Sequence, residues 1–343
     1  MKTDRPYIII SIIIVIIIVI IIVVFRCTFK EDVEKGISSY SLDSITVIDE
    51  LNDSIYFSNN INCIREQNDT ILLCDTKLAH IIAIDKEMNF LYVLGGKGLG
   101  PGELVIPDNF CIDSENIYVK DKNIQMVNYN NKRYIKTSLC PNVITRGNSR
   151  FFFNEGNFYH TSHSIKGPIV CFNEKNDSVR YIDIFTIWDE PDDFPFHSTR
   201  HLIRGNNSFF AIGQVLPIFH EYTFEGELLR EYDLTQIPLI KKNVSRYKGT
   251  PKLPNSYFIM TRDACYSNNY IYLLVGKKTE NDFSCNDILV FDVSQKKNSI
   301  NYIARLKLDK KSFSSICIIN DRLYAFNPAK ASLNQYQLPN FSK

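Results

Sequence analysis

The sequence predicts an all-β protein made of repeated units behind an apolar N-terminal segment. Three observations carry this prediction. After residue 40, short runs of Ile, Val, Tyr and Phe alternate with turns of Asn, Asp, Gly and Lys, as between Ile117 and Ile124. Few windows have the apolar spacing of an amphipathic helix. A turn followed directly by an aromatic or aliphatic strand recurs six times.

The first element is an apolar run from Tyr7 to Phe25, in which 18 of 19 residues are apolar. At about 1.5 Å per residue, a helix of this length covers roughly the 30 Å hydrocarbon core of a membrane. Lys and Arg are nearly balanced on its two sides, so the short stretch before the run favours an inside N-terminus. We assign residues 1–26 to a membrane anchor, a transmembrane helix or signal segment, with the remainder facing the periplasm or cell exterior.

Cys27 follows the apolar run directly, where a bacterial lipoprotein signal places its acylated cysteine. The small residue usual before that cysteine is missing, and Arg26 fits the position poorly. An uncleaved anchor is therefore the favoured interpretation, while lipidation at Cys27 and ordinary signal cleavage are the alternatives. We assign residues 27–40 to a linker and residues 41–343 to the β domain.

The repeat spacing predicts the architecture of that domain. The steps between the first strand residues of the six copies are 46, 41, 51, 61 and 53 residues. Those strand residues are Ile71, Ile117, Phe158, Phe209, Tyr270 and Leu323. Each step matches one four-stranded blade of a β-propeller, with insertions in the later blades. Several copies continue through a charged turn into a further strand, which we interpret as the inner pair of a blade. The prediction is a six-bladed β-propeller.

The strand-like segment Ser44–Ile48 precedes the first full unit and has no partner strand of its own. Propellers hide their terminal strand edges by closing the ring, commonly with an N-terminal strand that completes the last blade. We predict this closing role for residues 44–48. The alternative is a separate short hairpin.

A glycine-rich segment lies between the first two units, with the sequence LGGKGLGPGE from Leu94 to Glu103. Lys97 is followed by glycine rather than Ser or Thr, so the Walker pattern fails, and a proline occupies the last glycine of the dinucleotide fingerprint. We predict a structural turn between blades, in which the Glu103 carboxylate binds backbone amides. The residues of this turn are Gly96, Gly98, Gly100, Pro101, Gly102, Glu103 and Pro107.

This segment and the strands after it resemble NHL-type repeats. More closely, the pattern G-x-G-x-G-P-G-E followed by Pro107 resembles exported or lipid-anchored six-bladed propellers of Bacteroidetes, an NHL- or TolB-like family. The match in order and spacing covers about 45 residues, and the six units extend it weakly over residues 40–340. The resemblance implies the propeller fold and an exported location, and it implies no particular activity.

Composition narrows the class of function. The chain has 39 Lys and Arg against 38 Asp and Glu, which excludes a nucleic-acid binder that works through bulk positive charge. Its nine cysteines lie mostly inside apolar strand-like runs, where cysteine acts as a small buried hydrophobe, although one or two disulfides stay open. Because no C-x-x-C pair occurs, we expect no zinc ribbon, and we expect no cofactor.

The main candidate for ligand contact joins the third and fourth units. It combines carboxylates with aromatic rings, a set that suits a sugar or a hard cation, and basic residues follow it. A solvated insertion loop is the plainer interpretation. The candidate residues are Trp188, Asp189, Glu190, Asp192, Asp193, His197, Arg200 and His201. The spacings of His160 with His163 and of His197 with His201 also occur in metal sites, but solvated loop histidines are favoured here.

No hydrolase signature occurs within a single stretch of the sequence. We therefore expect a membrane-tethered binding or scaffolding module, with a protein or glycan ligand at a mouth of the central channel. The alternative is a channel-centred hydrolase or lyase acting on a carbohydrate or peptide. An enzyme should gather several His, Asp, Glu or Arg side chains at one mouth, and a scaffold should not.

Overall fold

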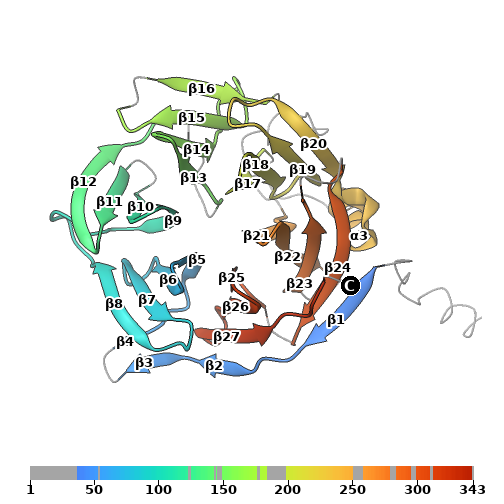
Figure 1. The fold of residues 1–343 in the computed structure, drawn as a ribbon, viewed down its shortest axis with the longest axis horizontal. Helices are drawn as coiled ribbons and strands as arrows, with labels where there is room; N and C mark the ends of the chain where they lie inside the picture. Colours follow the sequence, from blue (N-terminus) through green and yellow to red (C-terminus); the bar gives the residue numbers. More distant parts are fainter. Residues whose placement is uncertain are drawn as a thin grey trace, which may run out of the picture. The chain divides into compact units, whose positions relative to one another are not determined.

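A computed structural model describes residues 37–343, except for positions 53–54, 123–124, 143, 145–148, 176–177, 184–197, 250–257, 279–282, 295–298, 310–311 and 342–343. These residues form one compact unit from Ser38 onward. Figure 1 shows its sheets arranged in a ring, with one edge of each sheet toward the axis. The prediction of an all-β six-bladed propeller is confirmed.

The first four blades are sheets of four consecutive antiparallel strands, and the last two blades each add one N-terminal strand to their consecutive strands. The first blade contains β5 (Ile61–Gln67), β6 (Thr70–Asp75), β7 (His80–Asp85) and β8 (Phe90–Gly95). The second contains β9 (Pro107–Asp113), β10 (Asn116–Asp121), β11 (Gln125–Asn130) and β12 (Arg133–Leu139). The third contains β13 (Phe152–Asn154), β14 (Asn157–Thr161), β15 (Ile169–Asn173) and β16 (Val179–Ile182).

The fourth blade contains β17 (Arg200–Arg204), β18 (Phe209–Gly213), β19 (Ile218–Tyr222) and β20 (Leu228–Asp233). The fifth contains β21 (Thr261–Ser267), β22 (Tyr270–Lys278), β23 (Phe283–Asp292) and β24 (Asn301–Leu308). The sixth contains β25 (Ser315–Ile319), β26 (Arg322–Asn327) and β27 (Ser332–Gln337). A small hairpin pairs β3 (Glu50–Asn52) with β4 (Ile55–Tyr56).

The sequence repeat marks the two middle strands of each blade. The six predicted strands are β6, β10, β14, β18, β22 and β26, each second in its sheet. We had interpreted each of these strands and the strand after it as the inner pair of a blade. That interpretation was wrong, because the strand before the turn lies nearest the axis (Figure 1). That first strand carries charged residues among its apolar ones, as at Arg65 and Asp263, so it lacks the continuous apolar run of a middle strand.

Two N-terminal strands join the last two blades. β2 (Thr46–Ile48) pairs antiparallel with β27, and the backbone amide of Ile45 donates to the carbonyl of Gln335 at 2.8 Å. The predicted closing role of residues 44–48 is thereby confirmed. β1 (Ser38–Leu42) adds a fifth strand to the fifth blade by pairing parallel with β24, which the sequence analysis did not anticipate.

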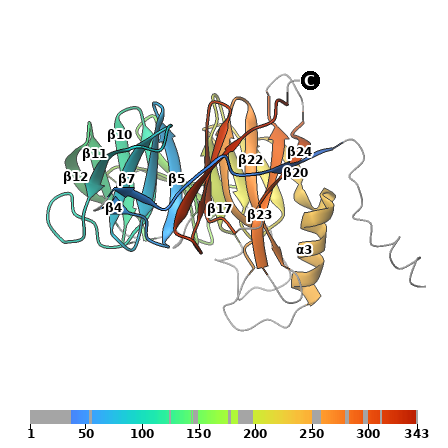
Figure 2. The ribbon, with the colours of Figure 1, turned by 90° about the horizontal axis from the view of Figure 1, so that it is seen from below.

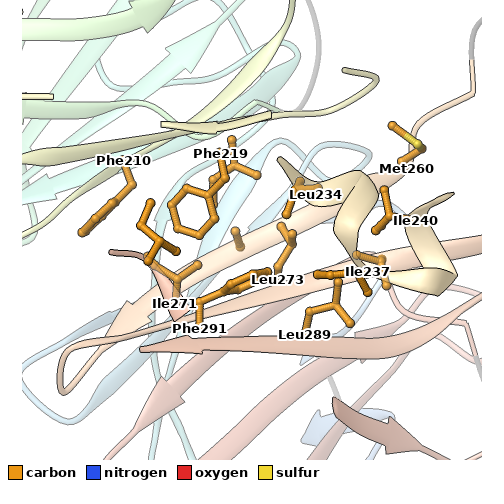
Figure 3. Close-up of a cluster of buried hydrophobic side chains, with 14 of the residues drawn as sticks. Phe210, Phe219, Leu234, Ile237, Ile240, Met260, Ile271, Leu273, Leu289 and Phe291 are labelled. Carbon is orange, nitrogen blue, oxygen red and sulfur yellow. The ribbon is translucent and has the colours of Figure 1, made fainter. Parts of the chain in front are cut away.

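Apolar clusters fill the interfaces between neighbouring blades. The cluster between the fourth and fifth blades, drawn in Figure 3, packs Phe219 of β19 against Phe291 of β23 and continues to the helix α3 (Pro238–Gly249). α3 begins at a proline, a favoured first helical residue, and buries Ile240 and Val244, which lie four residues apart on one helix face. Figure 2 shows α3 at the rim of the ring, near β20 and β24.

The eight cysteines within the described ranges are all buried and all free. They act as small apolar side chains in the interfaces, as Cys74 and Cys285 do. The predicted anchor at residues 7–25 and the lipidation candidate Cys27 lie outside the described residues. Among the residues that are described, none belongs to a helix long and apolar enough to cross a membrane.

Candidate functional site

The axis of the ring is occupied by an ion pair between Arg150 and Asp263. Arg150 lies two residues before β13, the innermost strand of the third blade, and Asp263 lies on β21 of the fifth blade. Arg150 Nε donates to Asp263 Oδ1 at 2.5 Å, and Nη2 donates to Oδ2 at 2.7 Å. This paired geometry is the fork-to-fork contact that arginine forms with carboxylates. Both side chains are buried, and the pair links the third blade to the fifth.

Asp263 has no hydrogen-bonding capacity left for a ligand. In addition to Arg150, its carboxylate accepts from the Ser315 hydroxyl at 2.5 Å and from the amides of Ile316 and Ala264 at 2.8 and 2.9 Å. Burial would raise the pKa of Asp263, but the neighbouring Arg150 charge outweighs it and lowers the pKa to about 2. Asp263 is therefore an anion at physiological pH, and its bonds hold three blades together.

Further hydrogen bonds extend this network to the remaining blades. Arg150 Nη2 also donates to the carbonyl of Ile316 at 2.7 Å and to that of Ile64 on β5 at 3.5 Å. On β9, the Asn109 side chain donates to the carbonyl of Ser149 at 3.1 Å and accepts from Arg65 Nη2 at 2.8 Å. The network thus ties the inner edges of the blades to one another.

His201 on β17 completes the network from the fourth blade. Its Nδ1 accepts from the Arg150 amide at 3.4 Å, and its Nε2 donates to the carbonyl of Thr261 at 3.1 Å, which fixes the tautomer. Burial lowers the pKa of His201 to about 4, and Asp263 counteracts burial only in part. His201 is therefore neutral at physiological pH, and both of its nitrogens are engaged by the backbone.

A pocket of about 200 Å³ lies beside this network, on the side of the ring where turns join the first and second strands of the blades. We call it the turn-side pocket. Its charged lining residues are Arg65, Glu66, Arg150 and Arg204. Its volume is below the roughly 300–1,000 Å³ usual for drug-sized ligands, so it fits one side chain or a comparably small group.

The remaining lining of the turn-side pocket is mostly apolar. The rings of Phe151 and Phe152 contribute, together with Cys111, Cys265 and Cys317 from three inner strands. Burial raises the pKa of all three thiols, that of Cys265 to about 12, so they stay protonated and are poor nucleophiles. The pocket offers a surface for binding, and its three thiols stay in the unreactive protonated form.

A second buried charge cluster lies between the second and third blades. Lys120 Nζ is 3.7 Å from Asp108 Oδ2, and burial lowers the pKa of Lys120 and raises that of Asp108. Burial, with a contribution from Lys120, holds the pKa of His160 well below its ordinary value. His160 donates from Nδ1 to its neighbour's carbonyl. None of these residues lines the turn-side pocket.

The predicted ligand residues divide into two groups. Trp188, Asp189, Glu190, Asp192, Asp193 and His197 lie outside the described residues. Arg200 and His201 are described and buried, and the structure sends them to different places. His201 faces the axial network, whereas Arg200 forms an ion pair with Asp183 at the end of the third blade. Within the described residues, Arg200 Nε and Nη2 have no hydrogen-bond partner, although both atoms are buried.

The glycine-rich segment connects β8 to β9, between the first two blades. The Glu103 carboxylate accepts from the amide of Gly100 at 2.7 Å, and Tyr129 donates its hydroxyl hydrogen to the carbonyl of Gly102 at 2.6 Å. Gly102 has φ +77°, and a Cβ there would lie 2.9 Å from Tyr134, so both conformation and space favour glycine. In the described chain, no group of three His, Cys, Asp or Glu side chains is placed to bind a metal.

Sequence reasoning missed Arg65, Arg150 and Asp263, the residues that organise the axis. Arg150 has no charged neighbour on either side, while Arg65 and Asp263 each adjoin a residue of opposite charge. The partners Arg150 and Asp263 are 113 residues apart. The available signal was a charged residue just before a predicted turn and strand, repeated from unit to unit. That signal would have marked the inner strands without pairing the residues.

Comparisons with known proteins support the fold. No protein-family profile matches the chain, and no curated protein matches it. A Bacteroides fragilis protein described as exported matches with a TM-score of 0.57 at 13% identity, covering 89% of this chain and 100% of its own. A member of the DUF4221 family from Bacteroides vulgatus matches with a TM-score of 0.57 at 12% identity, covering 86% and 97%. A Bacteroides thetaiotaomicron protein of unknown function has a TM-score of 0.51 at 13% identity, covering 88% and 74%.

Proposed function

We propose that this propeller is an extracytoplasmic binding or scaffolding module, held at a membrane by residues 7–25, that takes a protein or glycan ligand at a mouth of the ring. Its location is inferred from the apolar run, and the exported description of the B. fragilis structure agrees with it. We also infer that the chain is related to the exported Bacteroidetes propellers that its glycine motif resembles.

The observation that carries a binding role is the saturation of the axial network. Arg, Asp and His side chains do converge there, as an enzyme would require, but they are buried and bonded to one another. General acid–base or nucleophilic catalysis needs a group that can reach the substrate and change its protonation state. The turn-side pocket instead combines apolar walls with arginine donors, which suits recognition.

Binding without turnover tests this proposal. The full chain in nanodiscs would be applied to an array of glycans and to a display library of peptides, with bound material analysed by mass spectrometry for cleavage. We expect binding and no product. Arg204→Glu at the pocket should weaken binding, whereas Arg133→Glu on the outer strand β12 should not. Product that accumulates with time and protein concentration would contradict the proposal, as would binding that is indifferent to Arg204→Glu.

The location is tested separately. A C-terminal alkaline phosphatase fusion is active only outside the cytoplasm, so we expect activity from the full chain and its loss when residues 1–26 are deleted. A second fusion would carry a fluorescent protein that folds only in the cytoplasm. Fluorescence from that fusion, with no activity from the phosphatase fusion, would contradict an extracytoplasmic propeller.

A further inference from the structure

One arginine in the turn-side pocket has no carboxylate partner among the described residues. The other two arginines of the pocket are neutralised, because Arg150 pairs with Asp263 and Arg204 Nη1 lies 3.0 Å from Asp113 Oδ1. Arg65 donates instead to neutral acceptors, the carbonyl of Ile64 at 3.0 Å and the side-chain oxygen of Asn109 at 2.8 Å. The positive charge of Arg65 is therefore not matched by a bonded anion.

Arg65 also keeps donors available. A guanidinium has five N–H groups, and the protein uses two of them in the contacts just described. Burial and the neighbouring Arg150 charge both lower the pKa of Arg65, which is the direction expected for a cation short of counter-charge. An incoming anion would relieve both effects. Its oxygens would receive charge-assisted hydrogen bonds, the strongest class that arginine forms.

The one acidic side chain that lines the pocket, Glu66, does not fill this role. No ion pair joins Glu66 to Arg65 in the part of the chain described. Burial raises the pKa of Glu66, and backbone hydrogen bonds from Asp69 and Asn68 in its own turn oppose that shift. Glu66 thus belongs to the rim, where its charge repels an entering anion.

The walls indicate which kind of anion the pocket takes. Beside its three arginines and Glu66 the pocket presents aromatic rings, aliphatic side chains and protonated thiols, and these side chains offer few polar partners to the hydroxyls of a sugar. A carboxylate on a short aliphatic stem matches both parts of the pocket, with methylenes on the apolar wall and oxygens on the guanidinium. The volume of about 200 Å³ suits one such side chain.

We propose that the turn-side pocket binds an acidic side chain, of the glutamate type, from a protein partner, with Arg65 as its carboxylate-binding residue. This inference rests on the proposed binding function and specifies its ligand. The partner would insert one carboxylate into a small pocket with apolar walls, in the manner of an anchor residue at a protein interface.

The test titrates the full chain with small probes and follows them by ligand-observed NMR. The probes are N-acetylglutamate α-amide, its uncharged analogue N-acetylglutamine amide, and glucuronate as the carboxylate of a sugar. We expect the glutamate probe to bind at least about tenfold more tightly than the other two, the ratio that one charge-assisted hydrogen bond provides.

Two substitutions of opposite sign check the assignment. Arg65→Gln should lower the affinity for the glutamate probe by about tenfold or more. Glu66→Gln should raise that affinity by about threefold, because a repelling charge at the rim is removed. Arg133→Gln removes the same charge from an exposed outer-strand position and should change nothing. Arg65→Lys keeps the charge without the fork and should give an intermediate affinity, while thermal unfolding verifies that each variant is folded.

Equal binding of glutamate and glutamine probes, or indifference to Arg65→Gln in a folded variant, would overturn the carboxylate assignment. Preference for glucuronate would overturn the protein partner in favour of an acidic glycan. These results are distinguishable from failure of the proposed function. Peptide-library binding that depends on Arg204 but not on Arg65 would keep the binding module and reject this ligand, whereas product formation would reject the binding module itself.

Discussion

At the scale of single residues, Asp263 is the residue on which the buried network at the axis of the ring most depends. Its carboxylate neutralises Arg150 and is bonded to β25 through Ser315 and Ile316. A buried charge that loses its partner is costly, because the remaining ion has been removed from water without compensation. Asp113 with Arg204 is the natural comparison, since that Asp–Arg pair lies at the surface, with 28% and 44% of the side chains exposed.

We expect Asp263→Asn to lower the free energy of unfolding by about 3–5 kcal/mol, and Asp113→Asn by about 1 kcal/mol or less. Urea unfolding followed by circular dichroism measures both. The double variant Asp263→Asn with Arg150→Met should recover part of the loss, because it removes the stranded charge. Similar losses for Asp263→Asn and Asp113→Asn would show that the axial pair is not the structural centre described above.

The cysteines make a second prediction at this scale. Those described are buried, and burial raises the pKa of thiols such as Cys63 and Cys140. Because the thiolate is the reactive form, native protein should react with Ellman's reagent at no more than one thiol, Cys27. In guanidinium chloride all nine thiols of the chain should react. Rapid reaction of two or more thiols in the native protein would contradict the described packing.

At the scale of elements, the sequence predicted some strands well and others poorly. The middle strands were found because each carries a run of apolar residues behind a turn of Asn, Asp or Gly, as at Asn268 and Asn269, which both adopt positive φ. The inner strands were obscured by their charges. α3 was missed because its apolar face needs only Leu239, Ile240 and Val244, too few to stand out as a helical period.

The N-terminal strands are the elements whose removal is most informative. β2 supplies the outer strand of the sixth blade, and Ile48 packs against the core between the sixth and first blades. A chain that begins at residue 49 loses this pairing. It also loses the contacts that the partly buried Tyr40 and Leu42 of β1 make with the apolar core. At about 1.5–3 kcal/mol for each large apolar side chain fully buried, we expect a loss of at least about 3 kcal/mol.

Differential scanning calorimetry compares that truncation with a chain that begins at residue 37, which retains both strands. The longer chain should melt as the full chain does, and the shorter one should melt several degrees lower and associate through its open edge on gel filtration. Identical melting of the two truncated chains would contradict the closing role of β2.

At the scale of the whole molecule, the near balance of charge does not indicate where individual charges lie. Net charge is +1, yet the charges that matter structurally are concentrated at the axis and between blades. Composition therefore predicted the absence of a basic surface and could not predict an internal ion pair. The candidate ligand residues were only partly informative for the same reason, since Arg200 and His201 are sequence neighbours on opposite faces of one strand.

Stability of the whole ring should decrease in mild acid. His201 has a folded pKa of about 4, below the value of about 6.5 usual for an unfolded chain, so between these pH values only the unfolded chain binds the proton. His201 alone should cost about 3 kcal/mol as pH falls from about 6.5 to about 4. Asp263 adds a further loss as pH falls from about 3.8 toward its folded pKa of about 2.

Urea unfolding at pH 8, 6.5, 5 and 4 measures this dependence in wild type and in His201→Gln. The comparison at pH 8, where the histidine is neutral in both states, reports packing alone. The difference between the two proteins in how steeply the free energy of unfolding changes between pH 6.5 and 4 reports proton binding by His201. A wild-type stability that is flat over this interval, or a slope that His201→Gln leaves unchanged, would contradict a buried neutral His201.

The pairing of β2 with β27 also dictates an order of events in time. Thr46 of β2 pairs with Gln335 of β27, so a strand synthesised early can pair only after the last described strand has been synthesised. Contacts this distant in sequence form slowly, because a long loop must close before they contribute. Until then the nascent chain carries an unpaired strand at each end. We therefore expect a chain that stops before Ser332 to be degraded in cells rather than to accumulate as a five-bladed fragment.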